Sequence, residues 1–447
     1  MTATVPAALS EPPVAAPLAP ADRIVAVDVV RGLAVLGILV MNVVEFGLPL
    51  HAYTDPSVAG GDTGTDLWTW LLQQALFDGR MRALFSMLFG AGLVLIDERM
   101  VRSGRGAGAA DLLLRRCLWL VPFGIAHRFV LQWTGDILYQ YGLLGALAVA
   151  CRRLRPRTQI LAGLLLLAAF VPIEAWHHHQ LAEQRDQAAR ATQLAAAGEA
   201  VPPDLQRART RWEQRGQSPR AEDNEPEIAA VRGSYPTVFA YRWNYHHTFQ
   251  SVYVYEYFVW DVLGMMLIGM GLCRLGFFSG TMRTRSYVLA IVAGAVAAAI
   301  SFALSWQQAA VRFTSTALWL NTVAHASYAF LRLCGGLGWA ALLILCVRRG
   351  ALRIVTAPLA DVGRMAFSNY VLQTVCCTLF FFGYGLGHYA EYSRSELMWV
   401  WLAVTAVQVV FSIAWLRWYR FGPLEWAWRA LTYWQRPPFR RAARAGT

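Results

Sequence analysis

Residues 27–49 read VDVVRGLAVLGILVMNVVEFGLP, and this stretch decides the fold class. Apart from Asn42, every residue from position 32 to position 44 is apolar or glycine. An apolar helix of about 20 residues is long enough to cross the roughly 30 Å hydrocarbon core of a bilayer. We therefore predict a membrane-spanning helix at 25–46, with its charged residues near the two ends.

The rest of the chain repeats this pattern. Of its 447 residues, 56% are hydrophobic and 15% are charged, whereas about a quarter of the residues in a soluble protein are charged. Ten apolar segments predict ten transmembrane helices, at 25–46, 68–97, 112–132, 136–151, 158–175, 251–273, 286–306, 323–347, 364–386 and 397–419. The predicted fold class is all-α, a polytopic helical membrane protein.

The arginines give these spans an orientation. The chain contains no lysine, and its arginines gather in every second loop: five at 98–116, four at 152–157, three at 274–285, three at 348–353 and four after residue 435. The intervening short loops contain at most one arginine each. Because positive residues favour cytoplasmic loops, we predict that both termini are cytoplasmic and that the protein lies in the bacterial cytoplasmic (inner) membrane.

The formal net charge of +12 has the same explanation. Arginines at the ends of spans contact anionic lipid headgroups, so membrane lipids are expected partners and nucleic acid is not. The seven cysteines lie in or beside apolar segments without CxxC spacing, which argues against a disulfide framework and against a metal site. The run His177–His179 is more typical of an exposed patch than of metal ligands. The sequence defines no oligomeric state.

The chain divides into five regions. We expect a disordered Pro/Ala-rich tail at 1–22 without a cleavable signal peptide, membrane helices at 23–175, an external loop at 176–250, further membrane helices at 251–419, and an interfacial cytoplasmic helix with a basic tail at 420–447. The composition of the external loop favours helix, so we expect one or two amphipathic helices near the membrane surface. Gly422-Pro423 marks the start of the C-terminal helix, on which Glu425 and Arg429 are spaced to pair.

Polar residues inside membrane spans are costly and often mark functional sites. The predicted orientation places Asn42, Glu45, Asp78, Arg80, His127, Asp136, Glu256 and Asp261 towards the external face, and Asp28, Arg31, Arg364, Asn369 and Gln373 towards the cytoplasmic face. The candidate substrate-binding residues among them are Asp28, Arg31, Arg80, Asp261, Arg364, Asn369 and Gln373. Structural roles stay open for the same residues, namely an Asp28–Arg31 ion pair, snorkelling by Arg80 and interhelical hydrogen bonding by Asn369.

The stretch HRFVLQWTGDIL at 127–138 places an imidazole and a carboxylate at one turn. Histidine is the usual general base near neutral pH, a carboxylate can orient it, and an asparagine can donate a hydrogen bond to a developing oxyanion. His127, Asp136 and Asn42 are therefore candidate catalytic residues for acyl transfer. Two alternatives stay open: Asp136 follows Thr-Gly and can cap the next helix, and the same residue types suit a polar transport site.

Several motifs resemble one known family. VDVVRGLAVLGILVMNVVEFGLP, RALFSMLFGAGLVL and GIAHRFVLQWTGDILYQYGLLG, followed by DVLGMMLIGMGL, GRMAFSNYVLQT and FGPLEWAWRALTY, are similar to the YeiB family of bacterial membrane proteins, which carries a domain of unknown function. That family resembles, more distantly, a superfamily of transmembrane acyltransferases, which includes the lysosomal heparan-glucosaminide N-acetyltransferase and bacterial enzymes that acylate surface glycans. The heparan enzyme uses a histidine shortly after the residue that matches Asn42, and His51 stands in roughly that place here.

This resemblance implies a function. A cytoplasmic acyl-CoA would be the donor and a glycan or lipid headgroup at the external face the acceptor, with no permanently bound cofactor. Arg31 and Arg364 would meet the anionic donor, while His127, oriented by Asp136, would deprotonate the acceptor. A transporter for a small polar or lipid-linked solute is the second hypothesis, suggested by the weak likeness of LFGAGLVL and LIGMGLCR four spans apart. A non-catalytic scaffold in envelope assembly is the third.

Overall fold

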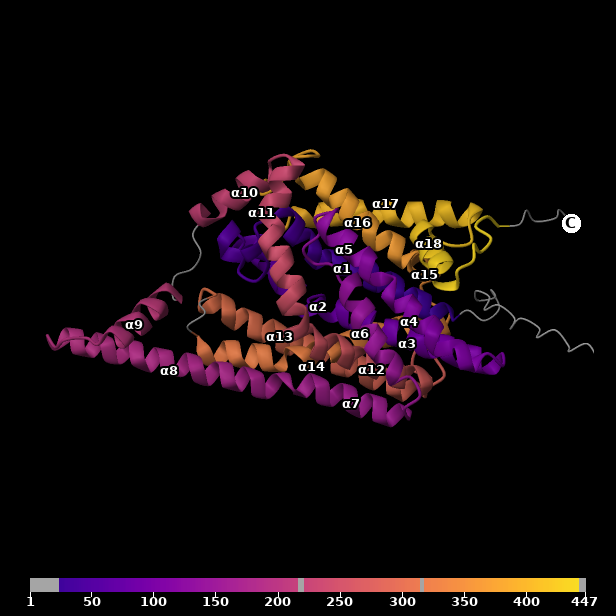
Figure 1. Cartoon of the computed structure of the whole chain (residues 1–447), viewed down its shortest axis with the longest axis horizontal. Coiled ribbons are helices and arrows are strands. Elements are labelled where there is room, and N and C mark those ends of the chain that lie inside the picture. Colours follow the sequence, from indigo (N-terminus) through magenta and orange to yellow (C-terminus); the bar gives the residue numbers. More distant parts are fainter. Residues whose placement is uncertain (1–23, 216–220, 314–316, 442–447) are drawn as a thin grey trace, which may run out of the picture.

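The computed structural model describes residues 24–215, 221–313 and 317–441, which fold into a bundle of helices (Figure 1). These residues contain no strand, so the prediction of an all-α fold is confirmed. The tail predicted at 1–22 and the end of the basic tail, residues 442–447, lie outside the described residues.

The helices coincide with the predicted apolar segments, and further helices fill the predicted external loop. In chain order they are α1 (Val25–Gly47), α2 (Gly64–Leu76), α3 (Arg80–Arg102), α4 (Ala109–Leu118), α5 (Leu120–Phe129), α6 (Leu138–Ala150), α7 (Pro156–Ala168), α8 (Phe170–Ala196), α9 (Pro203–Arg215), α10 (Glu225–Val231), α11 (Tyr235–Thr248), α12 (Val259–Arg274), α13 (Thr284–Ala310), α14 (Leu318–Arg348), α15 (Arg353–Arg364), α16 (Ala366–Phe381), α17 (Leu397–Trp418) and α18 (Pro423–Tyr433). A π-helical segment, Phe249–Phe258, joins α11 to α12.

Five helical segments in the described part of the chain are long and apolar enough to cross a membrane. They are α1, α13, α14, α17 and the continuous Pro156–Ala196 formed by α7 and α8, and the bent pair of α11 and α12 adds a sixth if it counts as one span. The chain is therefore a multi-pass membrane protein. Two of the remaining predicted spans are broken into shorter helices: 68–97 near Gly79, where φ is +64°, and 112–132 at Trp119. The total of ten spans stays a prediction.

The first helix, α1, forms the centre of the bundle. In its most apolar window 83% of the residues are buried inside the protein, against 17% for α13, which lies at the periphery. Two glycines allow α1 to touch α15 backbone to backbone. A Cβ atom added at Gly32 would lie 1.9 Å from the Leu359 carbonyl oxygen, and one added at Gly363 would lie 1.9 Å from the Asp28 carbonyl oxygen.

The two similar stretches LFGAGLVL and LIGMGLCR pack against each other. A Cβ atom at Gly90 of α3 would lie 2.1 Å from the carbonyl oxygen of Met266, and one at Gly269 of α12 would lie 2.0 Å from that of Met87. Small residues permit such close helix crossings in membranes. The likeness of the two stretches therefore corresponds to one reciprocal contact between α3 and α12.

The predicted external loop begins inside a helix. Instead of ending near residue 175, the helix runs without a break from Pro156 to Ala196, because no strong helix breaker occurs between Pro172 and Gly198. Helix α9 folds back on α8, and the resulting hairpin projects beyond the bundle (Figure 1). The chain then returns, and Glu227 of α10 accepts hydrogen bonds from the Leu50 amide and the Tyr389 hydroxyl.

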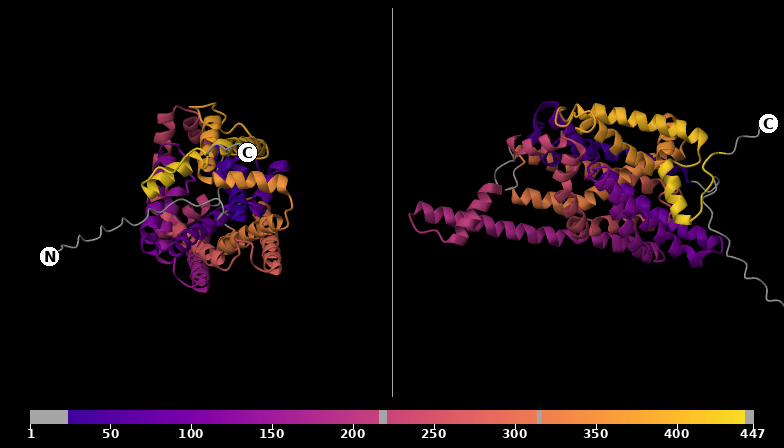
Figure 2. Two further views of the ribbon diagram at one scale, coloured as in Figure 1. Left: turned by 90° about the vertical axis from the view of Figure 1, so that its right-hand side faces the viewer. Right: turned by 45° about the horizontal axis from the view of Figure 1, so that its top comes forward.

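The arginine-rich loops gather at one end of the bundle. Helices α4, α15 and α18 lie at this end, which we call the arginine-rich end, and the α8–α9 hairpin and α10 lie at the opposite end (Figures 1 and 2). Ile24, at the start of the described chain, and Tyr433, near its end, line the same pocket at the arginine-rich end. This arrangement agrees with an even number of spans.

Candidate functional site

Two pockets open into the bundle from its two ends. The first, which we call the arginine pocket, has a volume of about 580 Å³ and is lined by residues of α1, α3, α4, α6, α15, α16 and α18. The second, the carboxylate pocket, has a volume of about 390 Å³ and is lined by α1, α3, the segment 50–54, the segment 134–140 and residues near α11 and α14. Ile137 lines both pockets, so only a thin layer separates them.

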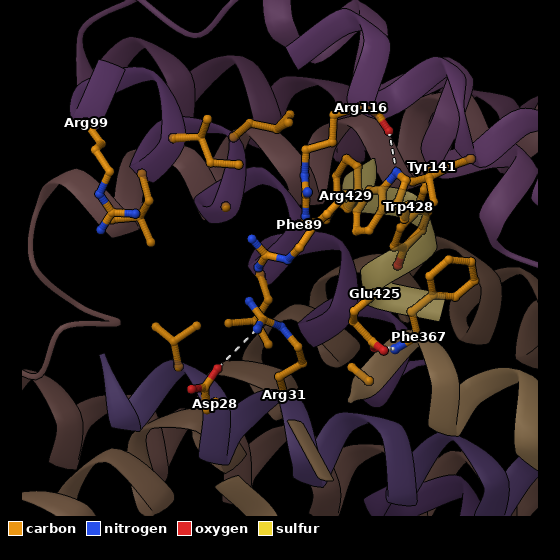
Figure 3. A pocket seen from close by; sticks show the side chains of 18 of the residues that line it. Asp28, Arg31, Phe89, Arg99, Arg116, Tyr141, Phe367, Glu425, Trp428 and Arg429 are labelled. Carbon is orange, nitrogen blue, oxygen red and sulfur yellow. Dashed lines mark hydrogen bonds and ion pairs between the residues drawn. The ribbon is translucent and has the colours of Figure 1, made fainter. Parts of the chain in front are cut away.

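Positive charge dominates the arginine pocket. Its lining contains the guanidinium groups of Arg31, Arg99, Arg102, Arg105, Arg116, Arg364 and Arg429 and the carboxyl groups of Asp28, Glu98 and Glu425. Arg31, Arg116 and Arg429 gather on one side of the pocket, and Arg99 lies across from them (Figure 3). The inner part of the pocket is apolar and aromatic, with Phe85, Leu88, Phe89 and Tyr141 in its lining. The pocket is therefore suited to a molecule with an anionic head and a less polar arm.

Helix α18 forms one wall of this pocket, and hydrogen bonds hold it against α16 and α4. The carboxylate of Glu425 accepts hydrogen bonds from the backbone amides of Phe367 and Ser368, at 2.7 and 3.1 Å, and from the Ser368 hydroxyl. Trp428 donates a hydrogen bond of 2.8 Å from its indole nitrogen to the Arg116 carbonyl oxygen. The predicted helix start at Pro423 is confirmed, but Glu425 bonds to the start of α16 and not to Arg429.

The carboxylate pocket collects acids, amides and aromatic side chains at the opposite end. Asn42 and Glu45 come from α1, His51 and Tyr53 from the turn that follows α1, and Asp136 from the turn before α6. Glu45 accepts a hydrogen bond from the Thr134 hydroxyl, and the Tyr53 hydroxyl donates to Asp78 at 3.2 Å. The catalytic candidates Asn42 and Asp136 thus line one pocket, as does His51.

His127 and Asp136 contact each other in the structure. The Nδ1 atom of His127 lies 2.7 Å from the Asp136 carboxylate, and its Nε2 atom lies 2.8 Å from the Thr374 hydroxyl of α16. The same carboxylate accepts hydrogen bonds from the backbone amides of Leu138 and Tyr139, at 3.2 and 3.1 Å. Asp136 therefore caps α6 and holds the imidazole at the same time. Both side chains are buried, and of the two only Asp136 lines a pocket, so His127 stands behind Asp136.

Tyr370 of α16 fixes the layer between the two pockets. Its hydroxyl donates to the Gly135 carbonyl at 3.1 Å and accepts from the Trp133 indole at 3.1 Å and from the Ile137 amide at 3.3 Å. The Trp133 ring is stacked on Phe46 of α1, with ring centroids 3.9 Å apart. One helix, α16, thereby holds both the turn that carries Asp136 and the histidine behind it.

Three of the seven predicted substrate-binding residues line a pocket. Asp28, Arg31 and Arg364 line the arginine pocket, and Arg31 and Arg364 pair with Asp28 at 3.3 Å and with Asp361 at 3.0 Å.

The other four, Arg80, Asp261, Asn369 and Gln373, connect helices and line neither pocket. Arg80 donates hydrogen bonds to the Gln74 carbonyl and the Ser301 hydroxyl, both at 2.8 Å, and Asp261 pairs with Arg332 and, at 3.5 Å, with Arg82. The side-chain amide of Asn369 donates to the Val362 carbonyl and the Ser412 hydroxyl, and that of Gln373 donates to the Val35 carbonyl and to Gln408. These donor groups are engaged between helices, whereas the side-chain amide oxygens of Asn369 and Gln373 are buried and accept no hydrogen bond from the described residues. Glu256, expected in the external group, is exposed on the π-helical segment.

Sequence reasoning missed most of the arginine pocket. The alternation of charge that orients the spans already accounts for Arg99, Arg102, Arg105 and Arg116. The sequence therefore provides no separate reason to predict that these arginines line a binding site. The C-terminal helix was predicted to lie on the membrane surface because its tryptophans suit the headgroup region. The structure adds a contact that no sequence signal indicated: the partly buried carboxyl group of Glu425 bonds to the start of α16.

Among the described residues, no three His, Cys, Asp or Glu side chains are placed to hold a metal ion. No solved structure matches the chain. Residues 272–435 match the family model described as a protein of unknown function, DUF418.

Full-length relatives cover the rest of the chain. An uncharacterised protein of Escherichia coli, YeiB, is 31% identical over 432 residues, which cover 92% of this chain and 96% of YeiB. An uncharacterised protein of Bacillus subtilis, YxaH, is 27% identical over 437 residues, which cover 93% of this chain and 96% of YxaH. The resemblance seen in the sequence motifs is thus borne out over nearly the whole length, and the chain belongs to the YeiB family of membrane proteins, whose second half carries the DUF418 domain.

Proposed function

We propose that this protein is a transmembrane acyltransferase that takes an acyl group from a cytoplasmic acyl-CoA and transfers it to an acceptor on the other side of the bacterial inner membrane. The observation that carries the proposal is the pair of pockets that open at opposite ends of the bundle and share Ile137. A donor and an acceptor bound in these pockets would meet at that layer without either crossing the membrane.

The arginine pocket supplies the donor side of this proposal. Cytoplasmic loops are rich in arginine, so the arginine-rich end faces the cytoplasm, where acyl-CoA is found. The phosphate groups of coenzyme A are anionic and suit guanidinium groups. The apolar inner lining around Phe85, Leu88 and Tyr141 suits the less polar arm that carries the thioester towards Ile137.

The carboxylate pocket supplies the acceptor side. A hydroxyl or amine of a glycan or lipid headgroup attacks the thioester carbonyl carbon, and its proton passes to a base in the pocket. The carbon–sulfur bond then breaks, and the thiolate leaves as coenzyme A and takes up a proton. Asp136 is the base that we assign, because it lines the pocket and is held in place by His127 and two backbone amides. Asn42 is the assigned donor to the developing oxyanion.

His127 has a different role under this assignment from the one that the sequence suggested. It lines neither pocket, so it acts as a positioning residue for Asp136. His51, which does line the carboxylate pocket, is the competing base. The two assignments differ in which substitution abolishes acyl transfer.

The decisive experiment compares acyl groups on envelope glycans and lipids from cells with and without the gene. Complementation with wild type should restore any acyl group that the deletion removes, and complementation with Asp136→Asn, expressed to the same level, should not. An acyl inventory that is identical in deletion and wild-type cells would contradict the proposal.

A transporter is the second candidate, and the reciprocal glycine contact between α3 and α12 favours it. Transporters are commonly built from repeated units, and two helices that pack through equivalent stretches have the arrangement expected of such units. Uptake of a solute by proteoliposomes without a covalent product would support transport and would contradict acyl transfer.

A further inference from the structure

We propose that Arg31, Arg116 and Arg429 form a phosphate subsite of the arginine pocket, with the C-terminal helix α18 as one of its walls. The ligand class is a soluble donor that carries diphosphate and phosphate groups, as coenzyme A does. The identity of the donor rests on the proposed function, whereas the anion site itself rests on the geometry described below.

Three guanidinium groups from three separate parts of the chain converge here. Arg31 comes from α1, Arg116 from α4 and Arg429 from α18, and they gather on one side of the pocket (Figure 3). Like charges repel, and the repulsion grows when the charges are removed from water. Burial lowers the pKa of Arg429, and the charge of Arg31 acts in the same direction, against the opposite effects of Tyr433 and Glu425. A bound anion would relieve this repulsion.

The carboxyl groups of Asp28 and Glu425 compensate the charge of these three arginines only in part. Asp28 pairs with Arg31 at 3.3 Å. Glu425 makes its hydrogen bonds to the start of α16. Arg116 lies over the ring of Trp428, 3.6 Å from its centroid, so its charge is stabilised by an aromatic face. A guanidinium held flat in this way keeps its planar fork of N–H donors in a fixed direction.

The geometry of phosphate oxygens suits such a cluster of guanidinium groups. Arginine binds phosphate through paired hydrogen bonds, and several arginines can bind the oxygens of neighbouring phosphates. The same pocket is lined by Arg102, at the end of α3, and by Ser103 and Arg105 of the loop that follows, so its mouth lies at the arginine-rich end of the bundle. A water-soluble phosphate ester can therefore enter without leaving the solvent.

The test measures ligand binding to the full chain in lipid nanodiscs. Coenzyme A and pantetheine, which lacks the phosphates and the nucleotide, are titrated into wild type, Arg116→Gln and Arg429→Gln. Each substitution should weaken coenzyme A binding about tenfold or more, the usual effect of removing a charged hydrogen bond, and should leave pantetheine binding unchanged. Arg349→Gln is the matched control, because Arg349 is exposed at the same end and lies outside the pocket lining. It should bind coenzyme A as wild type does.

Further measurements distinguish a soluble phosphate ligand from a lipid and the subsite from the proposed function. Pyrophosphate should displace coenzyme A, and phosphatidylglycerol added to the nanodisc should not; the reverse result would overturn the soluble donor. Normal coenzyme A binding by thermally stable Arg116→Gln and Arg429→Gln would overturn the subsite. If a glutamine variant unfolds, the lysine variant at the same position replaces it. Undiminished coenzyme A binding by folded lysine variants at both positions would contradict phosphate binding through the paired hydrogen bonds of arginine. If arginine-dependent binding occurs but no acyl transfer follows, the subsite stands and the proposed function fails.

Discussion

Gly32 lets α1 lie against α15 with no side chain between the two backbones, and Gly363 does the same from the other side. Each glycine stands next to a residue of the arginine pocket, Arg31 and Arg364. The crossing therefore sets the position of two pocket arginines. The requirement is steric, since an added Cβ atom would overlap a carbonyl oxygen.

We expect Gly32→Ala and Gly363→Ala to destabilise the protein, by about 1–3 kcal/mol or more, because overpacking forces backbones apart. Thermal unfolding in detergent measures the effect. Gly92→Ala is the control, since a Cβ atom there has no neighbour within 4 Å, and it should be neutral or slightly stabilising. A Gly32→Ala variant as stable as Gly92→Ala would contradict the close contact.

The contact between His127 and Asp136 is a second feature that single substitutions can test. The carboxylate lines a pocket and the imidazole lies behind it, so the two residues should respond differently to substitution. Both side chains are buried, but Asp136 lines the carboxylate pocket whereas His127 bonds to Thr374 in the interior.

We expect Asp136→Asn to lower the rate of acyl transfer on the order of 10²-fold or more, as loss of a general base does. His127→Asn keeps an N–H donor for the carboxylate and should retain most of the activity that His127→Ala loses. The pH–rate profile of His127→Asn should also keep the wild-type shape. If His127→Asn is as inactive as His127→Ala, the imidazole itself is the base, and if only His51→Ala is inactive, the base is His51.

Among the helices, α18 makes contacts that its sequence did not predict, while its predicted place at the membrane interface stays a prediction. The tryptophans that suggested a surface helix are present, yet Trp428 packs against Arg116 and Glu425 holds the start of α16. The helix therefore belongs to the pocket. Its attachment through one buried carboxyl makes the stability of this end of the bundle dependent on pH.

Burial raises the pKa of Glu425 above its ordinary value of 4.5. A carboxyl whose pKa rises on folding favours the folded state most when it is protonated, below about pH 4.5, and this contribution is lost as the pH rises through the folded-state pKa. We therefore expect wild type to lose stability relative to Glu425→Gln as the pH is raised from about 4.5. Thermal unfolding of both proteins across this range measures the difference. A difference that grows in favour of wild type would contradict the assignment.

On the scale of the whole molecule, the two pockets matter only if their mouths face opposite sides of a membrane. The arginine distribution predicts that the arginine-rich end faces the cytoplasm and that the helical hairpin of α8 and α9 stands outside. This orientation follows from charge and not from the fold.

Membrane-impermeant thiol labelling of intact cells tests the orientation. Ser103→Cys, in the exposed loop before α4, should stay unlabelled until the cells are opened, and Ala200→Cys, in the exposed tip between α8 and α9, should be labelled at once. The wild-type chain, whose cysteines lie in or beside apolar segments, supplies the background. The reverse pattern would place the arginine pocket outside and exclude a cytoplasmic donor there.

Local patterns in the sequence predict the positions of the helices well and the contacts between helices poorly. Apolar stretches such as 25–46 identify the spans because burial in lipid imposes length and composition. The pairing of His127 with Asp136 was predictable because nine residues and one turn separate them. No local rule brings together Arg31, Arg116 and Arg429, because each lies more than 80 residues from the next in the chain. The sequence predicted ligand binding for Arg80, Asn369 and Gln373 because the same residue types occur in ligand sites and in hydrogen bonds between buried helices.

The helix that runs from Pro156 to Ala196 has 41 residues, and at 1.5 Å per residue it measures about 62 Å, roughly twice the thickness of the hydrocarbon core. Its far half and α9 therefore reach well beyond the headgroups, and Gly198, at the tip, has φ of +74° and open space around it. A tag or a rigid carrier protein inserted at that tip would stand clear of both pockets. The tip of the hairpin is therefore a suitable insertion site for an affinity tag or for a carrier protein that aids imaging of the intact protein.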